Sequence, residues 1–287
     1  MKKHSLSILL IPIILSITSC AMLNSFVGDR VQKPQVSFVS AKLDGLSFDR
    51  ANLLFDLQIS NPNSVGLKMA GFDYDLLINN NSFIKGNQQK NLQIAPKGQS
   101  TVQLPLSVSF VELYQTYQSL KNQDTSMYQI NCGFSFDVPV LGVVNIPVSK
   151  SGEFPLLKIP KISLDELKLE NVSLTGAELN LGVAISNPNA FSMILKKIQY
   201  QFDVNNLNWI SGEAKEGMQI LEKGQGTVDI PITLNFIEMG RSVYQLIRGN
   251  KAINYKFGGN VDLNTSVPLL GQVNLPFDKT GTVNIVR

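Results

Sequence analysis

Histidine and cysteine are nearly absent from this sequence of 287 residues, which contains one histidine, His4, and two cysteines, Cys20 and Cys132. Histidine is the general base of most serine and cysteine hydrolases and the commonest ligand of catalytic zinc. His4 lies in a leader segment that we expect to be removed, so the mature chain has no histidine. We therefore expect no enzymatic activity, no catalytic residue, no metal site and no cofactor.

Cys132 and the charged residues further limit the chemistry and the kinds of partner expected of the mature chain. Cys132 lies in the apolar and aromatic run 128–136, which predicts a buried small side chain without a disulfide partner rather than a nucleophile. The chain has 25 basic and 22 acidic residues, and Lys2 and Lys3 belong to the leader. A nearly neutral mature chain argues against nucleic acid, or a purely electrostatic membrane patch, as the principal partner.

The N-terminal segment 1–19 has the organisation of a signal peptide, with two lysines followed by an apolar stretch. Its apolar run is shorter than the approximately 20 residues of a membrane span, and no later stretch reaches that length. The sequence Ile17-Thr18-Ser19-Cys20 resembles the lipobox of bacterial lipoproteins, which predicts lipidation of Cys20 and anchorage in a membrane. A plain secretory signal is the alternative. Ala21, where aspartate would resemble an inner-membrane retention signal, favours the outer membrane, facing the periplasm.

The rest of the chain consists of two copies of one sequence module. A shift of 126 residues places Pro34 on Pro160, Tyr74 on Tyr200 and the tripeptide Lys-Gly-Gln at 97–99 on the same tripeptide at 223–225. Near the end of each copy, the Pro-[Val/Leu]-Leu-Gly sequences at 139–142 and 268–271 align at a shift of 129. The predicted organisation is a leader at 1–19, a lipidated cysteine and tether at 20–33, and two modules at 34–155 and 156–287.

Each copy alternates apolar and polar residues, which predicts antiparallel strands with one buried face. In the first copy, the apolar positions of one such strand are Ala51, Leu53, Phe55, Leu57 and Ile59. The corresponding positions in the second copy are Ala177, Leu179, Leu181, Val183 and Ile185. One segment in each copy changes to a helical period, and Ser109 with Glu112, like Asn235 with Glu238, has the spacing of a helix N-cap. Gly249 suits the end of the second helix.

The pentapeptide Ile-Ser-Asn-Pro-Asn ends one strand in each copy. Proline fixes its own φ, has no amide hydrogen and disfavours helical geometry in the preceding residue, so the strand must leave its sheet there. The flanking asparagines can bond to nearby backbone groups. Because no nucleophile, base or metal ligand recurs beside this corner, we interpret it as a structural hinge, formed by Asn61, Pro62 and Asn63 in the first copy and by Asn187, Pro188 and Asn189 in the second.

These features together resemble the WHy domain of the group 2 (LEA type 2) late embryogenesis abundant proteins. The resemblance rests on the strand that ends in Ser-Asn-Pro-Asn, the aromatic alternating strand 198–204, and an extended strand that precedes a helix. It implies two tandem fibronectin-III-like or immunoglobulin-like antiparallel β-sandwiches, each with one short α-helix. It also implies a role in desiccation, osmotic or cold stress, with stress-labile proteins as clients.

The leading hypothesis is therefore a membrane-tethered, non-enzymatic protein of stress tolerance. A structural or scaffolding envelope lipoprotein and a carrier of an apolar ligand are the alternatives. An enzyme based on carboxylates could use Asp73 with Asp75, or Asp165 with Glu166, as acid and base. It is disfavoured, because glycosidase chemistry needs a tuned pair across a cleft, whereas Asp73 and Asp75 lie as neighbours on one polar strand face. Trp209 is interpreted as a core or edge aromatic.

Overall fold

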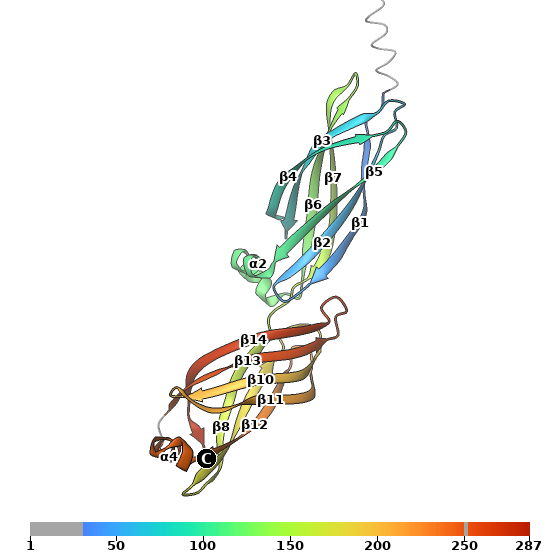
Figure 1. The fold of residues 1–287 in the computed structure, drawn as a ribbon. Helices are drawn as coiled ribbons and strands as arrows, with labels where there is room; N and C mark the ends of the chain where they lie inside the picture. Colours follow the sequence, from blue (N-terminus) through green and yellow to red (C-terminus); the bar gives the residue numbers. More distant parts are fainter. Residues whose placement is uncertain (1–30, 250–251) are drawn as a thin grey trace, which may run out of the picture. The chain divides into compact units, whose positions relative to one another are not determined.

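The structure, a computed structural model, describes residues 31–249 and 252–287. Strand pairing within these residues forms four sheets, two from strands β1–β7 and two from strands β8–β15 (Figure 1). We call the first set module 1 and the second set module 2. The mainly β architecture confirms the predicted pair of β-sandwiches.

Module 1 consists of a three-stranded sheet in the order β1-β2-β5 and a four-stranded sheet in the order β4-β3-β6-β7. Its helical elements lie between β5 and β6. The bounds are β1 (Gln35–Leu46), β2 (Arg50–Ser60), β3 (Leu67–Ile78), β4 (Asn81–Ile94), β5 (Gln99–Ser109), α2 (Phe110–Thr116), the 3₁₀-helix η1 (Gln118–Asn122), β6 (Thr125–Val138) and β7 (Gly142–Pro155).

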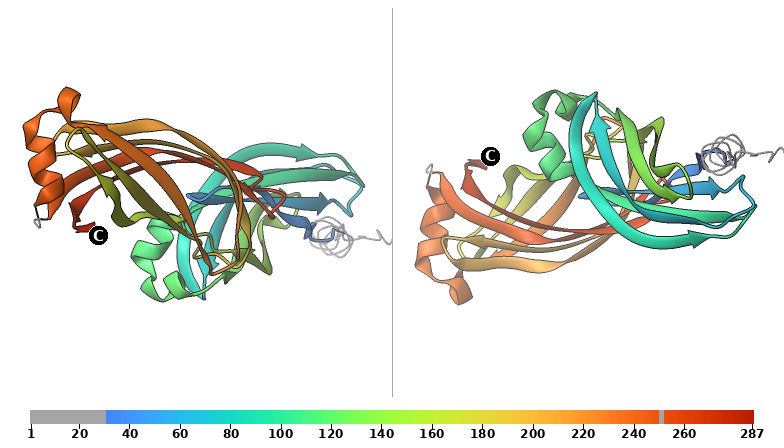
Figure 2. Two further views of the ribbon diagram at one scale, coloured as in Figure 1. Left: turned by 90° about the horizontal axis from the view of Figure 1, so that it is seen from below. Right: turned by 90° about the horizontal axis from the view of Figure 1, so that it is seen from above.

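Module 2 repeats this plan with sheets in the orders β12-β9-β8-β15 and β11-β10-β13-β14. Figure 2 shows α3 and α4 together at one end of its strands. The bounds are β8 (Lys161–Val172), β9 (Gly176–Ser186), β10 (Met193–Val204), β11 (Leu207–Ile220), β12 (Gln225–Asn235), α3 (Phe236–Met239), α4 (Arg241–Arg248), β13 (Ile253–Thr265), β14 (Gln272–Val283) and β15 (Ile285–Val286). β15 pairs with β8 in parallel, so this sheet is not purely antiparallel.

The predicted alternation gives the core of each module. All ten apolar positions named above in the two corresponding strands are buried, and the polar residues between them in β2 are partly exposed. Aromatic side chains fill the space between the sheets: the Phe72 and Phe134 rings stack with centroids 4.9 Å apart in module 1, and the Phe257 and Phe277 rings lie 4.9 Å apart in module 2. Such pairs stabilise a core beyond the burial of their area.

Two-residue turns fix the register of corresponding hairpins. Asn79 and Asn80 join β3 to β4 with φ of 49° and 64°, and Asn205 and Asn206 join β10 to β11 with φ of 46° and 67°. Two consecutive residues with positive φ match the twist of a hairpin, and asparagine tolerates this conformation better than most residues. The polar Asn-Asn pair therefore sets the same hairpin in both modules.

The helical segments begin at the predicted N-cap residues in both modules, but the helix of module 2 differs from the prediction in its extent. The Ser109 hydroxyl accepts a hydrogen bond from the Glu112 amide, and the Asn235 side chain accepts one from the Ile237 amide. In module 2, however, Gly240 with φ of 88° divides the expected single helix into α3 and α4. Gly249 is the C-cap of α4, as predicted, and the Arg287 guanidinium donates to three carbonyl oxygens at that end.

Candidate functional site

The first Asn-Pro-Asn corner is a fully bonded junction at the end of β2. Asn61 is 1% exposed, and its backbone N–H donates to the carbonyl oxygen of Gly98 at 2.9 Å. Its side-chain Nδ2 donates to the carbonyl oxygens of Val65 at 2.8 Å and Ala95 at 3.0 Å. Its Oδ1 accepts from the backbone N–H of Asn63 at 3.0 Å. One amide side chain thus joins the β2–β3 and β4–β5 loops.

The second asparagine of the corner binds the segment that enters the module. The backbone N–H of Gln32 donates to Asn63 Oδ1 at 2.7 Å, and Asn63 Nδ2 donates to the carbonyl oxygen of Gln32 at 2.8 Å. Because Asn63 is only 4% exposed, this paired contact is shielded from competing water. We call these two bonds the entry latch.

Module 2 forms the same latch. The backbone N–H of Lys158 donates to Asn189 Oδ1 at 2.8 Å, and Asn189 Nδ2 donates back to the Lys158 carbonyl at 2.8 Å. Asn187 repeats the bonds of Asn61, with Nδ2 donating to the carbonyls of Phe191 at 2.6 Å and Leu221 at 3.0 Å. In both modules the latched backbone lies 31 residues before the second asparagine. The two corners therefore make the same set of hydrogen bonds, each within its own module.

The repeated Lys-Gly-Gln sequence completes the corner. Lys97 and Lys223 have positive φ of 53° and 52°, and their backbone N–H groups donate to the carbonyl oxygens of Asn63 and Asn189 at 2.8 Å and 3.0 Å. The Lys223 Nζ also donates to the Pro188 carbonyl at 3.0 Å, and the Lys97 Nζ donates likewise to Pro62. Sequence comparison found this tripeptide but not its partner, because the two segments are about 35 residues apart in the chain.

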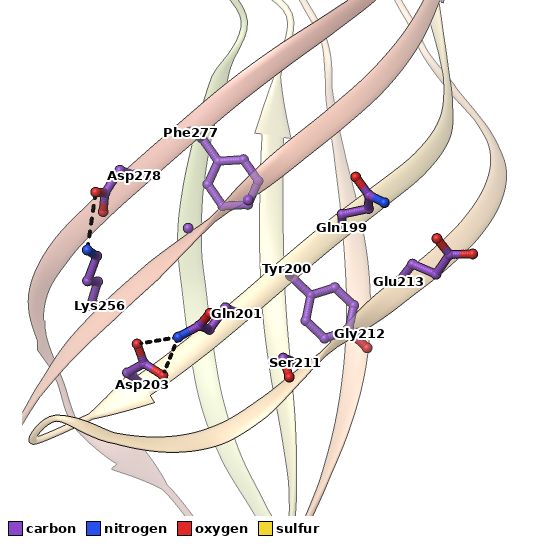
Figure 3. A pocket seen from close by; sticks show the side chains of 12 residues that line it. Gln199, Tyr200, Gln201, Asp203, Ser211, Gly212, Glu213, Lys256, Phe277 and Asp278 are labelled. Carbon is purple, nitrogen blue, oxygen red and sulfur yellow. Dashed lines mark hydrogen bonds and ion pairs between the residues drawn. The ribbon is translucent and has the colours of Figure 1, made fainter.

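A groove of about 650 Å³ lies on one sheet of module 2. β10, β11, β13 and β14 line it, and its side chains are mostly polar (Figure 3). Gly212 and the pair Gly258-Gly259 leave space there, and the Tyr200 ring lies over Gly212, whose added Cβ would be 3.1 Å from the Tyr200 oxygen. The polar side chains that line the groove can form hydrogen bonds with a molecule that lies along the sheet surface.

Each carboxylate of this groove already has a partner on a neighbouring side chain. Lys256 lies 3.5 Å from Asp278, and the Gln201 side chain donates to both carboxylate oxygens of Asp203 at 2.9–3.0 Å. Glu213 lies 3.7 Å from Lys215. A general acid or base needs a carboxylate directed at a reacting group, whereas these carboxylates bond to neighbouring side chains on an open surface. The arrangement supports contact rather than catalysis.

The carboxylate pairs considered from the sequence occupy exposed strand faces. Asp75 accepts a hydrogen bond from Ser82 at 2.6 Å and lies 3.4 Å from Lys85, and Asp73 is exposed beside it on β3. Asp165 and Glu166 are exposed at a register shift of β8. Within residues 31–249 and 252–287, no group of three or more His, Cys, Asp or Glu side chains could hold a metal ion. Trp209 is a core aromatic, 6% exposed, with its ring edge-on to Phe202.

Cys132 is buried, as predicted, with 3% of its surface exposed. Burial, reinforced by the Asp73 carboxylate, raises the pKa of its thiol from 9.0 to about 12. A thiol that stays protonated is a poor nucleophile, so this side chain acts as a small apolar group in the core of module 1.

The raised pKa predicts a loss of stability in alkali. Below pH 9.0 the thiol is protonated in both states; above it the unfolded chain ionises, while the folded chain stays protonated up to about 12. The free energy of unfolding of module 1 should therefore fall over this interval. Urea titrations between about pH 8 and 11 should show a smaller decline for Cys132→Val than for the parent, both carrying Cys20→Ser. Parallel declines would contradict the assignment.

Cys20 lies outside the described residues, so its lipidation stays a prediction. In the part of the chain that the structure describes, no helix is long and apolar enough to cross a membrane.

The fold and the corners define a protein built from tandem, corner-latched β-sandwiches. The family described as "Late embryogenesis abundant protein" (LEA_2) matches residues 56–152 and 182–281, once in each module, and the chain belongs to this family.

At low sequence identity, the chain is similar to two plant proteins named for desiccation and to a solved plant structure. A desiccation-related protein of Arabidopsis thaliana is 21% identical over 132 residues, which is 46% of this chain and 78% of that protein. A desiccation protectant protein Lea14 homolog of Glycine max is 23% identical over 142 residues, 48% of this chain and 91% of that protein. Among solved structures, AT1g01470 from Arabidopsis thaliana is 21% identical, with a TM-score of 0.37, and the match covers 45% of this chain and 85% of that one.

Proposed function

We propose that this chain is a non-enzymatic lipoprotein of the bacterial cell envelope, anchored through Cys20 to the outer membrane and facing the periplasm. There it protects envelope proteins or membranes during desiccation and osmotic stress. Membership of the LEA_2 family and the desiccation-related names of similar proteins support the stress role. The lipobox-like sequence at 17–20 supports the anchor.

The observation that carries the proposal is the paired, polar surface of the module 2 groove. Its carboxylates, amides and lysines form internal bonds, so the surface offers many weak polar contacts and no reactive centre. Such a surface can lie between partly unfolded client molecules and keep their apolar patches apart as water is lost. A folded spacer of this kind needs no cofactor and no defined ligand.

The filled interior of both modules favours this role over carriage of an apolar ligand. The space between the sheets in module 1 is occupied by fully buried rings such as Phe55, Phe134 and Phe136, and in module 2 by Phe202 and Phe257. A ligand between the sheets would have to displace closely packed side chains, which is costly.

The test compares cells that carry the parent gene, a deletion, or Cys20→Ser. We expect the deletion strain to survive drying and osmotic upshift less well than the parent, with the parent protein in the outer-membrane fraction. Cys20→Ser should leave that fraction, and incorporation of labelled palmitate at Cys20 should be lost. In vitro, the purified mature chain should preserve a dehydration-labile enzyme better than an equal mass of an inert globular protein. Equal survival of the deletion strain, together with no protection in vitro, would disprove the proposal.

Scaffolding is a second candidate, favoured by one apolar patch on module 2. Leu174 is 85% exposed in the β8–β9 loop, and Ile237 is 78% exposed at the start of α3. The two segments are joined by a hydrogen bond from the Phe236 amide to the Thr175 carbonyl at 2.9 Å. Exposed apolar side chains that lie together often mark a protein contact. Crosslinking in the envelope separates the two functions, since one stoichiometric partner indicates a scaffold and many partners indicate protection.

A further inference from the structure

The β6–β7 hairpin of module 1 ends in an exposed apolar tip. Val140 is 58% exposed, Leu141 39% and Val143 75%, and they follow Pro139 in the sequence. Figure 1 shows this hairpin projecting beyond the neighbouring strands. We call Val140, Leu141 and Val143 the apolar tip. Three adjacent apolar side chains in water are unfavourable unless something covers them.

The backbone of the tip is strained in a way that a smaller residue would relieve. Val140 has φ of 72°, a conformation in which a β-branched residue is a genuine outlier. A turn with proline at its second position and positive φ at its third normally has glycine or asparagine at that third position. Strained residues of this kind cluster at functional sites, because the fold would be more stable without them.

The tip lies at the end of module 1 where the chain enters. A groove at the base of the hairpin is lined by Asp137 and Pro139 together with Gly66 of the β2–β3 loop and Pro96 of the β4–β5 loop. Those two loops are the ones that Asn61 joins, and the corner they form holds the backbone of Gln32. The apolar tip and the point of entry therefore share one end of the module.

The length of chain before this point decides what can cover the tip. Twelve residue steps separate Cys20 from Gln32, and they can span at most about 43 Å. β6 alone, with 14 residues, is about 45 Å long. An anchor at Cys20 thus keeps the entry end, and not necessarily the opposite end of β6, within reach of the membrane surface. Lys33 is exposed at the entry end, and the exposed Lys68 lies opposite the exposed Asp137 of β6, so the apolar tip rather than net charge carries the proposed contact.

We propose that the apolar tip inserts into the interfacial region of the lipid bilayer to which Cys20 is anchored, so that module 1 docks on the membrane at two points. The inference rests on the anchor of the proposed function and adds a second, non-covalent contact. An acyl anchor alone leaves a protein free to tilt, whereas a buried hairpin fixes which end of module 1 faces the bilayer.

The corresponding hairpin of module 2 offers a natural comparison. Its Pro268-Leu269-Leu270-Gly271 sequence resembles that of module 1, but Leu270 is buried, with 7% exposed, and the positive φ of 57° falls on Gly271. The β13–β14 loop thus packs Leu270 against the module and leaves Leu269, 50% exposed, at its surface. Only module 1 presents three exposed apolar residues at this position of the described hairpins.

The test uses residues 20–287, coupled through the Cys20 thiol to maleimide lipids in vesicles of phosphatidylcholine with phosphatidylglycerol. The buried Cys132 thiol does not compete for the maleimide. The only tryptophan of the sequence, Trp209, is replaced by phenylalanine, the residue at the matching position 83 of module 1, and Val143→Trp reports on the tip. Val39→Trp is the control, because Val39 is also exposed, at 62%, but lies within β1.

We expect the emission of Val143→Trp to shift to shorter wavelength on coupling, with quenching by brominated lipids and an acrylamide quenching constant lower by about threefold or more. Val39→Trp should show none of these changes. Adding Val140→Gly and Leu141→Asn should abolish the tip signal without lowering the unfolding midpoint, since glycine relieves the positive φ. Leu269→Asn should leave the tip signal unchanged.

Two results would overturn the inference: a Val143→Trp spectrum that coupling to vesicles does not alter, or a spectral change of the same size at Val39→Trp. Because coupling does not depend on lipidation in cells, either result refutes the docking without touching the anchor. Absence of palmitate on Cys20, conversely, refutes the anchor and leaves this measurement interpretable.

Discussion

Asn61→Ala is expected to destabilise module 1 by about 3–5 kcal/mol. The substitution removes a buried amide that bonds to the carbonyls of Val65 and Ala95 and accepts the backbone N–H of Asn63. Alanine can replace none of these bonds, and the interior position excludes water as a substitute. Each buried group left without a partner costs about 1–3 kcal/mol. A loss of this size is a large part of the stability of a typical domain.

Thermal or urea unfolding of the mature chain measures this effect. Asn187→Ala should cost a similar amount in module 2, so if the modules unfold in separate transitions, each substitution should shift a different one. Asn81→Ala is the matched control, because Asn81 is exposed and its single side-chain bond, to the Asn79 carbonyl at 2.9 Å, lies at the surface. Its cost should stay within about 0.5 kcal/mol. If Asn61→Ala lowered the free energy of unfolding by no more than Asn81→Ala does, the corner would be only a turn.

The sequence predicts the core because each strand of the sandwich repeats a period of two with one buried face. The burial of Phe55 and Leu57 in module 1, and of Leu181 and Val183 in module 2, follows directly from that alternation. The helix starts are equally local, since Ser109 and Asn235 cap amides within three residues of themselves. Features that depend on neighbours in the sequence are therefore recovered well.

The entry latch shows what sequence patterns miss. The asparagines at 63 and 189 are identified as corner residues, but their partners are backbone groups of Gln32 and Lys158, which can be any residue type. A bond to a backbone leaves no signature at the partner position. The equal separation of 31 residues in both copies is a clue only after the contact is known.

The two hairpin tips show the opposite difficulty, in which similar sequences adopt different structures. In the strand pairing, Tyr74 lies opposite Cys132 in module 1, and Tyr200 lies opposite Gly259 in module 2. Residues of β13 therefore correspond to residues of β6 at a shift of 127 in the sequence. The Pro-[Val/Leu]-Leu-Gly sequences that follow align at 129, which places two extra residues in the loop of module 2. The longer loop turns Leu270 inward, whereas the short loop forces positive φ on Val140. Alignment alone could not locate these residues.

Gly259→Ala is expected to destabilise module 2 by about 4 kcal/mol or more, or to prevent its folding. Gly259 lies in the interior strand β13, opposite Tyr200 of β10 and Phe277 of β14. A Cβ at this position would be 1.9 Å from the carbonyl oxygen and 2.8 Å from the carbonyl carbon of Gln199, with φ of 156°. Because these atoms are backbone, no rotamer change can relieve the clash, and β13 would have to separate from β10.

Gly217→Ala provides the matched control in the same module, since a Cβ at Gly217 would meet no atom within 4 Å. Its free energy of unfolding should stay within about 0.5 kcal/mol of the parent. The decisive measurement is the urea midpoint of the module 2 transition for both variants, with the Asn61→Ala transition as the marker of module 1. Equal midpoints for Gly259→Ala and Gly217→Ala would mean that β13 can move away from β10 at little cost. The Gly258-Gly259 pair would then serve to open the polar groove rather than to let two strands pair closely.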